Sequence, residues 1–292
     1  MSERQLDPAL RDEVGVRYAV VVVLHASKRE LARLLPTIAP AQLVVVDAGP
    51  DDGGARLAEQ HGATLIVRRD NPGFGAANNL ALEYVTEPMT VLMNPDTLGS
   101  PHELARRAQA PGLHAPRLRN EDGSIQRSAH PLPGTLGAFL PAVLPKAPTR
   151  AEPHRVRKPR SVGWAIAAVL AARTDTLRAL GPFDPTIHLF AEDMDLCLRA
   201  RAEGIPTIYH ADLDITHTGR HSIDTEPFEL LARQRRDVIE RRRGTTARRL
   251  DDAAQLLTFA TRTLAKHPHN ERERAQLDAL LKQLRPGNPG PQ

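Results

Sequence analysis

The tripeptide Asn94-Pro95-Asp96 places a carboxylate directly after an apolar run, residues 90–93. A carboxylate at such a position can hold a divalent cation, which in turn neutralises a diphosphate. The alternative is an Asx-type turn, in which Asn94 and Asp96 only cap the next helix. Local sequence leaves both interpretations open.

A second acidic group, Asp47 with Asp51 and Asp52, follows another apolar run at residues 43–46. These carboxylates are suited to contact the base or the ribose of a nucleotide. They are equally suited to cap a helix that begins after Gly53. The residues alone do not decide between the two roles.

A third acidic group, Glu192, Asp193 and Asp195, stands at the start of an expected helix. Carboxylates this close repel one another unless a cation or protons intervene. The alternative is a favourable interaction with the helix dipole. His217 follows a short apolar strand and is a candidate metal ligand, although a lone histidine is more often structural or solvated.

The glycine-containing stretch at residues 71–79 resembles a phosphate-binding loop. It is not a dinucleotide fingerprint, because Asn78 stands where the third glycine would be. A helix that begins beside Gly73 could still favour an anion. By itself, a pair of glycines separated by one residue is weak evidence for a phosphate-binding site.

Strands alternate with helices through the first part of the chain. Apolar runs predict four strands, at Tyr18–Leu24, residues 43–46, Thr64–Val67 and residues 90–93. The stretches between them predict helices at residues 28–35, 53–61 and 75–84. This alternation is typical of an α/β fold with a mostly parallel sheet, in which ligands bind beyond the carboxyl ends of the strands. Asp47 and Asp96 lie at two such ends.

The rest of the chain reads differently. Prolines are so frequent in residues 111–160 that we expect mostly loop there. Order returns at residues 162–172. Further helices are predicted at Thr174–Leu180 and residues 191–203, 227–243, 251–266 and 271–284, and short strands at residues 207–209 and 213–216.

Composition sets the broad class. The 292 residues carry a net charge of +4 and a single cysteine, Cys197, so no disulfide within the chain is possible and a reducing compartment is expected. The apolar runs are too short to span a bilayer, and the polar N-terminus does not resemble a signal peptide. We therefore expect a cytoplasmic protein, with peripheral contact at the inner face of the membrane left open.

Taken together, the order and spacing of these motifs resemble family 2 glycosyltransferases of the GT-A fold, in particular the rhamnosyltransferase-like branch. The resemblance covers residues 19–222. It is carried by VVVDAGPDDG, DNPGFGAANN, VLMNPD, NEDGSIQRS, the block GPFDPTIHLFAEDMDLCLRARAEG and the closing HTGRHS.

The resemblance implies a GT-A fold: a Rossmann-like, mostly parallel central sheet flanked by helices, here followed by a C-terminal helical appendage. With the pattern of the remaining residues, we expect a polar extension at residues 1–17, a transferase domain at 18–225, a helical region at 226–284 and a disordered tail at 285–292. The implied reaction is inverting transfer of a sugar, with rhamnose one candidate, from a nucleotide-diphosphate donor to a hydroxyl acceptor. The acceptor could be a glycan, a lipid-linked glycan or a small molecule, as in cell-wall or polysaccharide biosynthesis.

The resemblance also implies roles for particular residues. Asp193, with Glu192, would supply the general base, and Asp96 and His217 would bind Mg²⁺ or Mn²⁺. Trp164 and Asp195 would lie on the acceptor side. The donor nucleotide would be contacted by Asp47, Asp52, Asn71, Gly73, Asn79, Asn94 and Asp96.

Two alternatives remain at the level of sequence. One is a sugar nucleotidyltransferase on a similar sheet, although residues 24–27 lack the glycine-rich loop with a basic residue that this class carries. The other is a non-catalytic module that binds nucleotide or nucleic acid through the arginines of residues 233–249. That stretch could also contact anionic lipid or be a solvated helix face.

Overall fold

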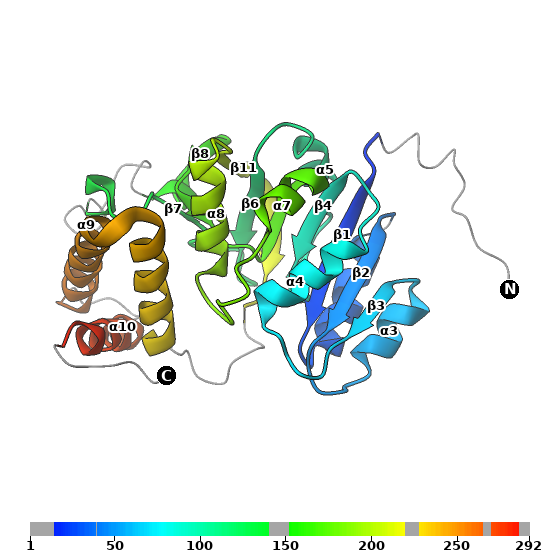
Figure 1. Cartoon of the computed structure of the whole chain (residues 1–292), viewed down its shortest axis with the longest axis horizontal. Helices are drawn as coiled ribbons and strands as arrows, with labels where there is room; N and C mark the ends of the chain where they lie inside the picture. Colours follow the sequence, from blue (N-terminus) through cyan, green and yellow to red (C-terminus); the bar gives the residue numbers. More distant parts are fainter. Residues whose placement is uncertain (1–14, 39, 140–151, 220–227, 265–269, 286–292) are drawn as a thin grey trace, which may run out of the picture.

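The computed structural model describes residues 15–38, 40–139, 152–219, 228–264 and 270–285. Within these residues, nine strands form one sheet in the order β3-β2-β1-β4-β10-β6-β11-β5, with β8 paired to β11 (Figure 1). The first four are β1 (Tyr18–Leu24), β2 (Gln42–Asp47), β3 (Thr64–Val67) and β4 (Met89–Met93). The others are β5 (Thr97–Leu98), β6 (Leu113–Arg119), β8 (Arg160–Val162), β10 (Val169–Arg173) and β11 (Thr207–His217).

The four N-terminal strands run parallel, and β6 and β11 are also parallel to each other. Because β10 is antiparallel to both β4 and β6, the latter two strands point the same way. The carboxyl ends of β1, β2, β4, β6 and β11 therefore meet at one edge of the sheet, and β10 begins there. The predicted α/β class and mostly parallel sheet are confirmed.

Helices cover both faces of the sheet because its central strands are apolar on both sides. In β1, Ala19 and Val21 face one hydrophobic core while Val20 and Val22 face the other. The first core includes residues of α4 (Phe74–Glu83), α7 (Thr174–Leu180) and α8 (Glu192–Ala202). The second includes residues of α2 (Lys28–Leu34), α3 (Gly54–Gln60) and α5 (His102–Arg107).

Strand β6 corrects the expectation of a loop at residues 111–160. The sequence does not reveal this strand because Pro116 lies inside it. A proline cannot donate to a ladder, and central strands usually exclude it. Here β10 pairs with β6 only at Ala171 opposite His114, so Pro116 pairs with β11 alone.

The two short strands expected at residues 207–209 and 213–216 are one strand, β11, with a register shift between His210 and Asp214. The helices expected at 227–243 and 251–266 correspond to the two limbs of α9 (Phe228–Leu264), which meet at Gly244, where the backbone is not helical. Gly244 has a φ of 84°, a conformation that suits glycine.

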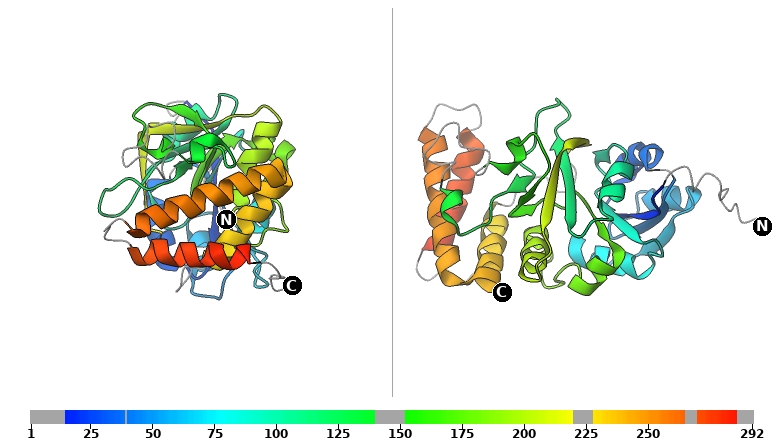
Figure 2. Two further views of the ribbon diagram at one scale, coloured as in Figure 1. Left: turned by 90° about the vertical axis from the view of Figure 1, so that its left-hand side faces the viewer. Right: turned by 90° about the horizontal axis from the view of Figure 1, so that it is seen from above.

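The C-terminal helices form a separate layer beside the sheet, in which α10 (Asn270–Leu284) packs along α9 (Figure 2). The two limbs of α9 are tied together by ion pairs of Arg235 with Asp251 and of Arg236 with Asp252. In the described part of the chain, no helix has the length and apolar character needed to cross a membrane. The expected domain boundary at residue 225 and the tail after residue 285 lie outside the described residues.

The backbone at Gly134 packs closely against α9 of the C-terminal layer. Gly134 has a φ of +69°, and a Cβ there would lie 2.5 Å from the carbonyl oxygen of Ala247, just after the bend in α9. Gly62 has a similar φ of +76° but open space around it. An alanine would strain the backbone at both positions, but only at Gly134 would its methyl group also collide with neighbouring atoms. Comparing the two positions therefore isolates the effect of steric packing.

We predict that Gly134→Ala lowers the free energy of unfolding by about 1–3 kcal/mol more than Gly62→Ala, because only the first variant drives a methyl group into neighbouring backbone. Urea denaturation of both variants measures the difference. Equal losses would mean that α9 is not held by this contact.

Candidate active site

The carboxyl edge of the sheet gathers residues that are far apart in the sequence. Asp47 ends β2, the Asn94–Asp96 turn follows β4, and His217 ends β11. Strand β5 comes directly after the turn and pairs with β11, with Thr97 opposite His217. This pairing brings Asp96 against His217, so that Asp96 Oδ1 lies 3.4 Å from His217 Nε2.

Gln126 fixes the orientation of the His217 ring. The Gln126 amide nitrogen donates to the backbone carbonyl of His217 at 2.6 Å, so the Gln126 oxygen must accept from His217 Nδ1, at 3.0 Å. With its proton held on Nδ1, a neutral His217 directs the lone pair of Nε2 at the Asp96 carboxylate. Two acceptors face each other in this way only when a proton or a cation lies between them.

The pKa of Asp96 reflects this neighbour. Burial by itself raises it. With a proton between the two groups, the hydrogen bond and positive charge of His217, together with the Gly219 N–H that donates to Oδ2 at 2.9 Å, bring the pKa below its ordinary value. Asp96 is therefore a carboxylate at neutral pH. Its side chain bonds across the edge to Gly219, which differs from the local Asx turn that was the alternative.

These residues fit a divalent cation. A metal-bound histidine usually donates its other ring nitrogen to a fixed oxygen, as His217 does to Gln126. Close by, Asn94 Oδ1 is buried without a hydrogen-bond partner. Within the described residues, no group of three or more His, Cys, Asp or Glu side chains gathers as a complete protein cage. A site with two protein ligands suits Mg²⁺ or Mn²⁺ completed by phosphate oxygens and water.

Helix α8 brings a second carboxylate pair to the same edge. Ala167 N–H donates to Asp193 Oδ2 at 3.4 Å, and the carbonyl of the adjacent Ala168 accepts from Asn94 N–H at 2.8 Å. Two consecutive residues thus link Asp193 to the turn that carries Asp96. Asp193 Oδ1 also accepts from Met194 N–H at 2.7 Å.

Glu192 and Asp193 both have raised pKa values. Burial is the main cause for each, and for Glu192 the adjacent Asp193 charge adds to it. Backbone N–H groups and then the charge of Arg235 partly offset the rise at Asp193. Glu192 Oε2 is buried without a partner. The pair therefore holds one proton more readily than two separate carboxylates would, which suits a group that accepts a proton near neutral pH.

On the opposite side of the edge, Asp47 is held by Arg69, whose Nη1 donates to Asp47 Oδ2 at 2.8 Å and also to the carbonyl of Gly49. Asp52 instead caps two helices, accepting from Lys28 N–H at 2.7 Å and Gly54 N–H at 2.8 Å. The bonds of Asp52 are therefore those of a helix cap. Asp47 instead forms an ion pair with Arg69 at the carboxyl end of β2.

The glycine-containing loop leads into α4. Asn71 has a φ of 45° and its Oδ1 accepts from Gly73 N–H at 3.4 Å. A Cβ on Gly73 would lie 2.5 Å from the carbonyl oxygen of His188, so this glycine packs against the loop before α8. Asn79 exchanges two hydrogen bonds with the backbone of Phe183, at 2.8 and 3.1 Å. Its amide joins α4 to that loop, and both of its polar atoms have protein partners.

The two acceptor-side candidates differ in their surroundings. Trp164 lies in β9 (Trp164–Ala165), which pairs with β7 (Ala129–His130), and its ring stacks on His130 at 4.0 Å between centroids. Asp195 is completely buried, and its carboxylate binds Arg199 and Arg242, each at 2.7 Å. Asp195 therefore fastens α8 to α9.

Sequence reasoning assigned no role to Arg69, Gln126 or Arg235. Gln126 lies inside the NEDGSIQRS motif, and Arg69 directly precedes DNPGFGAANN. The motifs therefore indicated the segments that contain these two residues, but not the residues themselves. Arg235 belongs to the arginine-rich stretch interpreted as a lipid-binding or solvated face, yet its guanidinium lies 5.8 Å from the centre of the Trp164 ring. Nothing local in the sequence indicates that contact.

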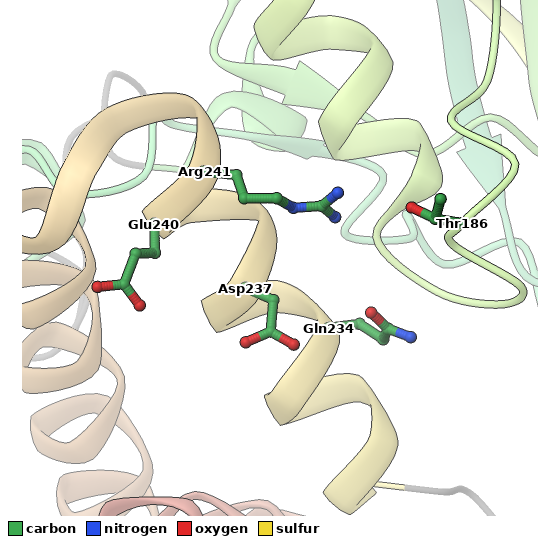
Figure 3. Close-up of a pocket in the computed structure, with 5 residues that line it drawn as sticks. All are labelled: Thr186, Gln234, Asp237, Glu240 and Arg241. Carbon is green, nitrogen blue, oxygen red and sulfur yellow. The ribbon is translucent and has the colours of Figure 1, made fainter. Parts of the chain in front are cut away.

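A groove of about 380 Å³ lies outside this edge, between α9 and the loop before α8. It is lined by Thr186, Gln234, Asp237, Glu240 and Arg241 (Figure 3). Arg241 reaches across toward the loop that carries Thr186 and binds Asp184 at 3.0 Å. The groove contains none of the candidate residues, so the chemistry is assigned from the contacts at the sheet edge.

Solved structures share the fold at low sequence identity. A mannosyltransferase from Pyrobaculum calidifontis, in complex with GDP-Man and Mn²⁺, has a TM-score of 0.59 at 14% identity, over 91% of this chain and 85% of that one. TarS 1–349 of S. aureus, in complex with UDP-GlcNAc, has a TM-score of 0.52 at 14% identity, over 91% and 80%. This chain spans 44% of a longer TarS structure.

Sequence comparison is more specific. The chain is 26% identical to the N-acetylglucosaminyl-diphospho-decaprenol L-rhamnosyltransferase of Mycobacterium tuberculosis, over 73% of this chain and 80% of that protein. The sequence model described as "Glycosyltransferase like family 2" matches residues 15–238. The expected family is confirmed, and with it the expected enzyme class. The chain belongs to glycosyltransferase family 2 and is a glycosyltransferase.

Proposed function

We propose that this enzyme transfers a sugar, with L-rhamnose the first candidate, from a nucleoside-diphosphate donor to a hydroxyl of a lipid-linked sugar acceptor. We further propose that the reaction inverts the anomeric configuration and depends on Mg²⁺ or Mn²⁺. The observation that carries the proposal is that Asp96 and His217 are in contact at the carboxyl edge of the sheet, while Asp193 is linked through Ala167 and Ala168 to the turn that carries Asp96. The rhamnosyltransferase relative, named for an acceptor with a diphospho-decaprenol, supports the choice of sugar and acceptor.

In this proposal Asp193 removes the proton from the acceptor hydroxyl as that oxygen attacks the anomeric carbon. Its carboxylate is held by the Ala167 and Met194 N–H groups, so its position is fixed before the substrate arrives. Glu192 keeps a proton on the neighbouring site. One direct displacement inverts the configuration, by the logic that governs inverting glycosidases, and needs no covalent intermediate.

Asp96 and His217 would hold the cation, which when bound offsets the negative charge of the diphosphate leaving group. Gln126 keeps Nε2 of His217 available as a ligand. Mn²⁺ in the structure of the related mannosyltransferase supports this choice of ion. Asp47 and Arg69 would contact the nucleoside, and Asn71 and Gly73 would shape the loop beside it.

The first test follows donor binding and transfer separately. Asp193→Asn removes the proton acceptor but keeps the shape of the side chain, so we expect sugar transfer to fall by roughly 10²–10⁴-fold. Donor affinity, measured by calorimetry, should stay within about threefold of the wild type because the base does not bind the donor phosphates. NMR of the wild-type product gives the anomeric configuration.

The hypothesis fails if the wild-type chain transfers no sugar from a panel of UDP-, GDP- and dTDP-sugars to a polyprenyl-diphosphate-linked sugar. It also fails as an inverting mechanism if the product retains the donor configuration. Undiminished transfer by Asp193→Asn would remove Asp193 from the role of base.

The second test concerns the metal. Asp96→Ala should weaken Mn²⁺-supported donor binding by roughly tenfold or more and leave the remaining affinity insensitive to EDTA, because one of two protein ligands is lost. Asp175→Ala, at an exposed position on α7, is the matched control and should keep the response to EDTA. Donor affinity that ignores both EDTA and the Asp96 change would contradict the metal assignment.

A further inference from the structure

Arg235, on the C-terminal helix α9, reaches the part of the proposed acceptor side that contains Trp164. The Arg235 guanidinium carbon lies 5.8 Å from the centre of the Trp164 ring, and Nη1 lies 4.0 Å from the sulfur of Met194. Met194 is the residue after Asp193. Arg235 therefore touches both the strand segment and the helix turn that frame the proposed base.

Asp251 fixes this guanidinium. Its two carboxylate oxygens accept from Arg235 Nε and Nη2 at 2.9 and 2.8 Å, a bidentate pair that sets the plane as well as the position of the group. The charge of Asp251 also keeps the pKa of Arg235 above its ordinary value although burial opposes this. Arg235 is a permanent cation in this place.

The indole of Trp164 is enclosed by its neighbours. His130 stacks on the ring with an interplanar angle of 10°, and Arg235 lies over the ring as a cation–π contact. Trp164 Nε1 is buried without a hydrogen-bond partner. Burial, and next the charge of Arg235, lower the pKa of His130 to about 3, so His130 stays neutral and adds no competing charge.

We propose that Arg235 is a positioning residue of the transfer reaction. Held by its ion pair with Asp251, it packs over the Trp164 ring and fixes its orientation, and it keeps a fixed positive charge beside Asp193. Through this side chain α9 completes the acceptor side of the active site. The inference rests on the proposed function, because it assigns Arg235 a part in setting the base of that reaction.

The charge of Arg235 favours the ionised form of Asp193, which is the form that accepts a proton. Burial, and in turn the charge of Asp193, raise the pKa values of Glu192 and Cys197 on α8. The β9–β10 connection contributes the Ala167 N–H. Removing the cation therefore raises the pKa of Asp193, and activity at low pH is lost earlier as the pH falls.

The chain supplies a matched control one residue away. Arg236 makes an equivalent pair between the limbs of α9, with Nε donating to Asp252 at 3.0 Å and Nη1 to the Gln283 carbonyl at 2.8 Å. Arg235→Met and Arg236→Met thus remove the same charge from the same helix. Only the first removes it from Trp164 and Asp193.

The experiment measures kcat and KM for both substrates from pH 5 to 9, with the melting temperature of each full-length variant. We expect Arg235→Met to lower kcat by at least about tenfold and to move the acid limb of the pH profile up by about one unit. Arg236→Met should keep kcat within about threefold and leave the acid limb in place, although its melting temperature also falls.

Two further variants guard against misfolding. Arg235→Lys keeps the charge and should restore the acid limb while kcat stays reduced, because a lysine cannot form the bidentate pair. Asp251→Asn loosens the hold on Arg235 but keeps the arginine. It should therefore lower kcat, and it should shift the acid limb of the pH profile less than Arg235→Met does. Equal kcat and equal acid limbs for Arg235→Met and Arg236→Met, in an active wild type, would overturn the inference alone. A wild type without transfer would overturn the proposed function, and the inference with it.

Discussion

The contact between Asp96 and His217 is the constraint on which the account of this site depends. The pairing of β5 with β11 forces the two side chains together, and Gln126 turns the His217 ring so that its Nε2 lone pair meets a carboxylate. Such an arrangement is unfavourable unless a proton or a cation lies between the acceptors. In the proposed reaction these two side chains would bind the cation, and the fold already holds them in contact.

The second constraint is the link from this pair to Asp193, the proposed base. The Ala167 N–H bonds to Asp193 and the Ala168 carbonyl bonds to the Asn94 N–H, so this segment couples Asp193 to the turn after β4. The arginines of α9 extend the same framework. Arg242 binds the buried Asp195 and Arg235 binds Asp251, so several charges of the arginine-rich stretch are neutralised within the chain. Arg242 thereby ties α9 to α8, the helix that carries Asp193.

The first half of the fold could be predicted from sequence because its strands are continuous apolar runs and its helices carry apolar stripes. Strand β6 could not, since Pro116 conceals it, and the pairing of β5 with β11 is a long-range contact without a local pattern. Motifs located Asp96, Asp193 and His217. They could not reveal that Asn79 binds backbone, that Asp195 is an ion-pair anchor, or that Arg235 reaches Trp164, because those contacts depend on how distant elements pack.

The most direct test of the account is the position of manganese in crystals grown with a nucleoside diphosphate and Mn²⁺. Anomalous scattering locates the ion without reference to the protein map. We expect a single strong peak within roughly 2.0–2.4 Å of both Asp96 and His217 Nε2, in contact with the phosphates. A peak bound elsewhere, or phosphates bound away from this pair with no manganese, would contradict it.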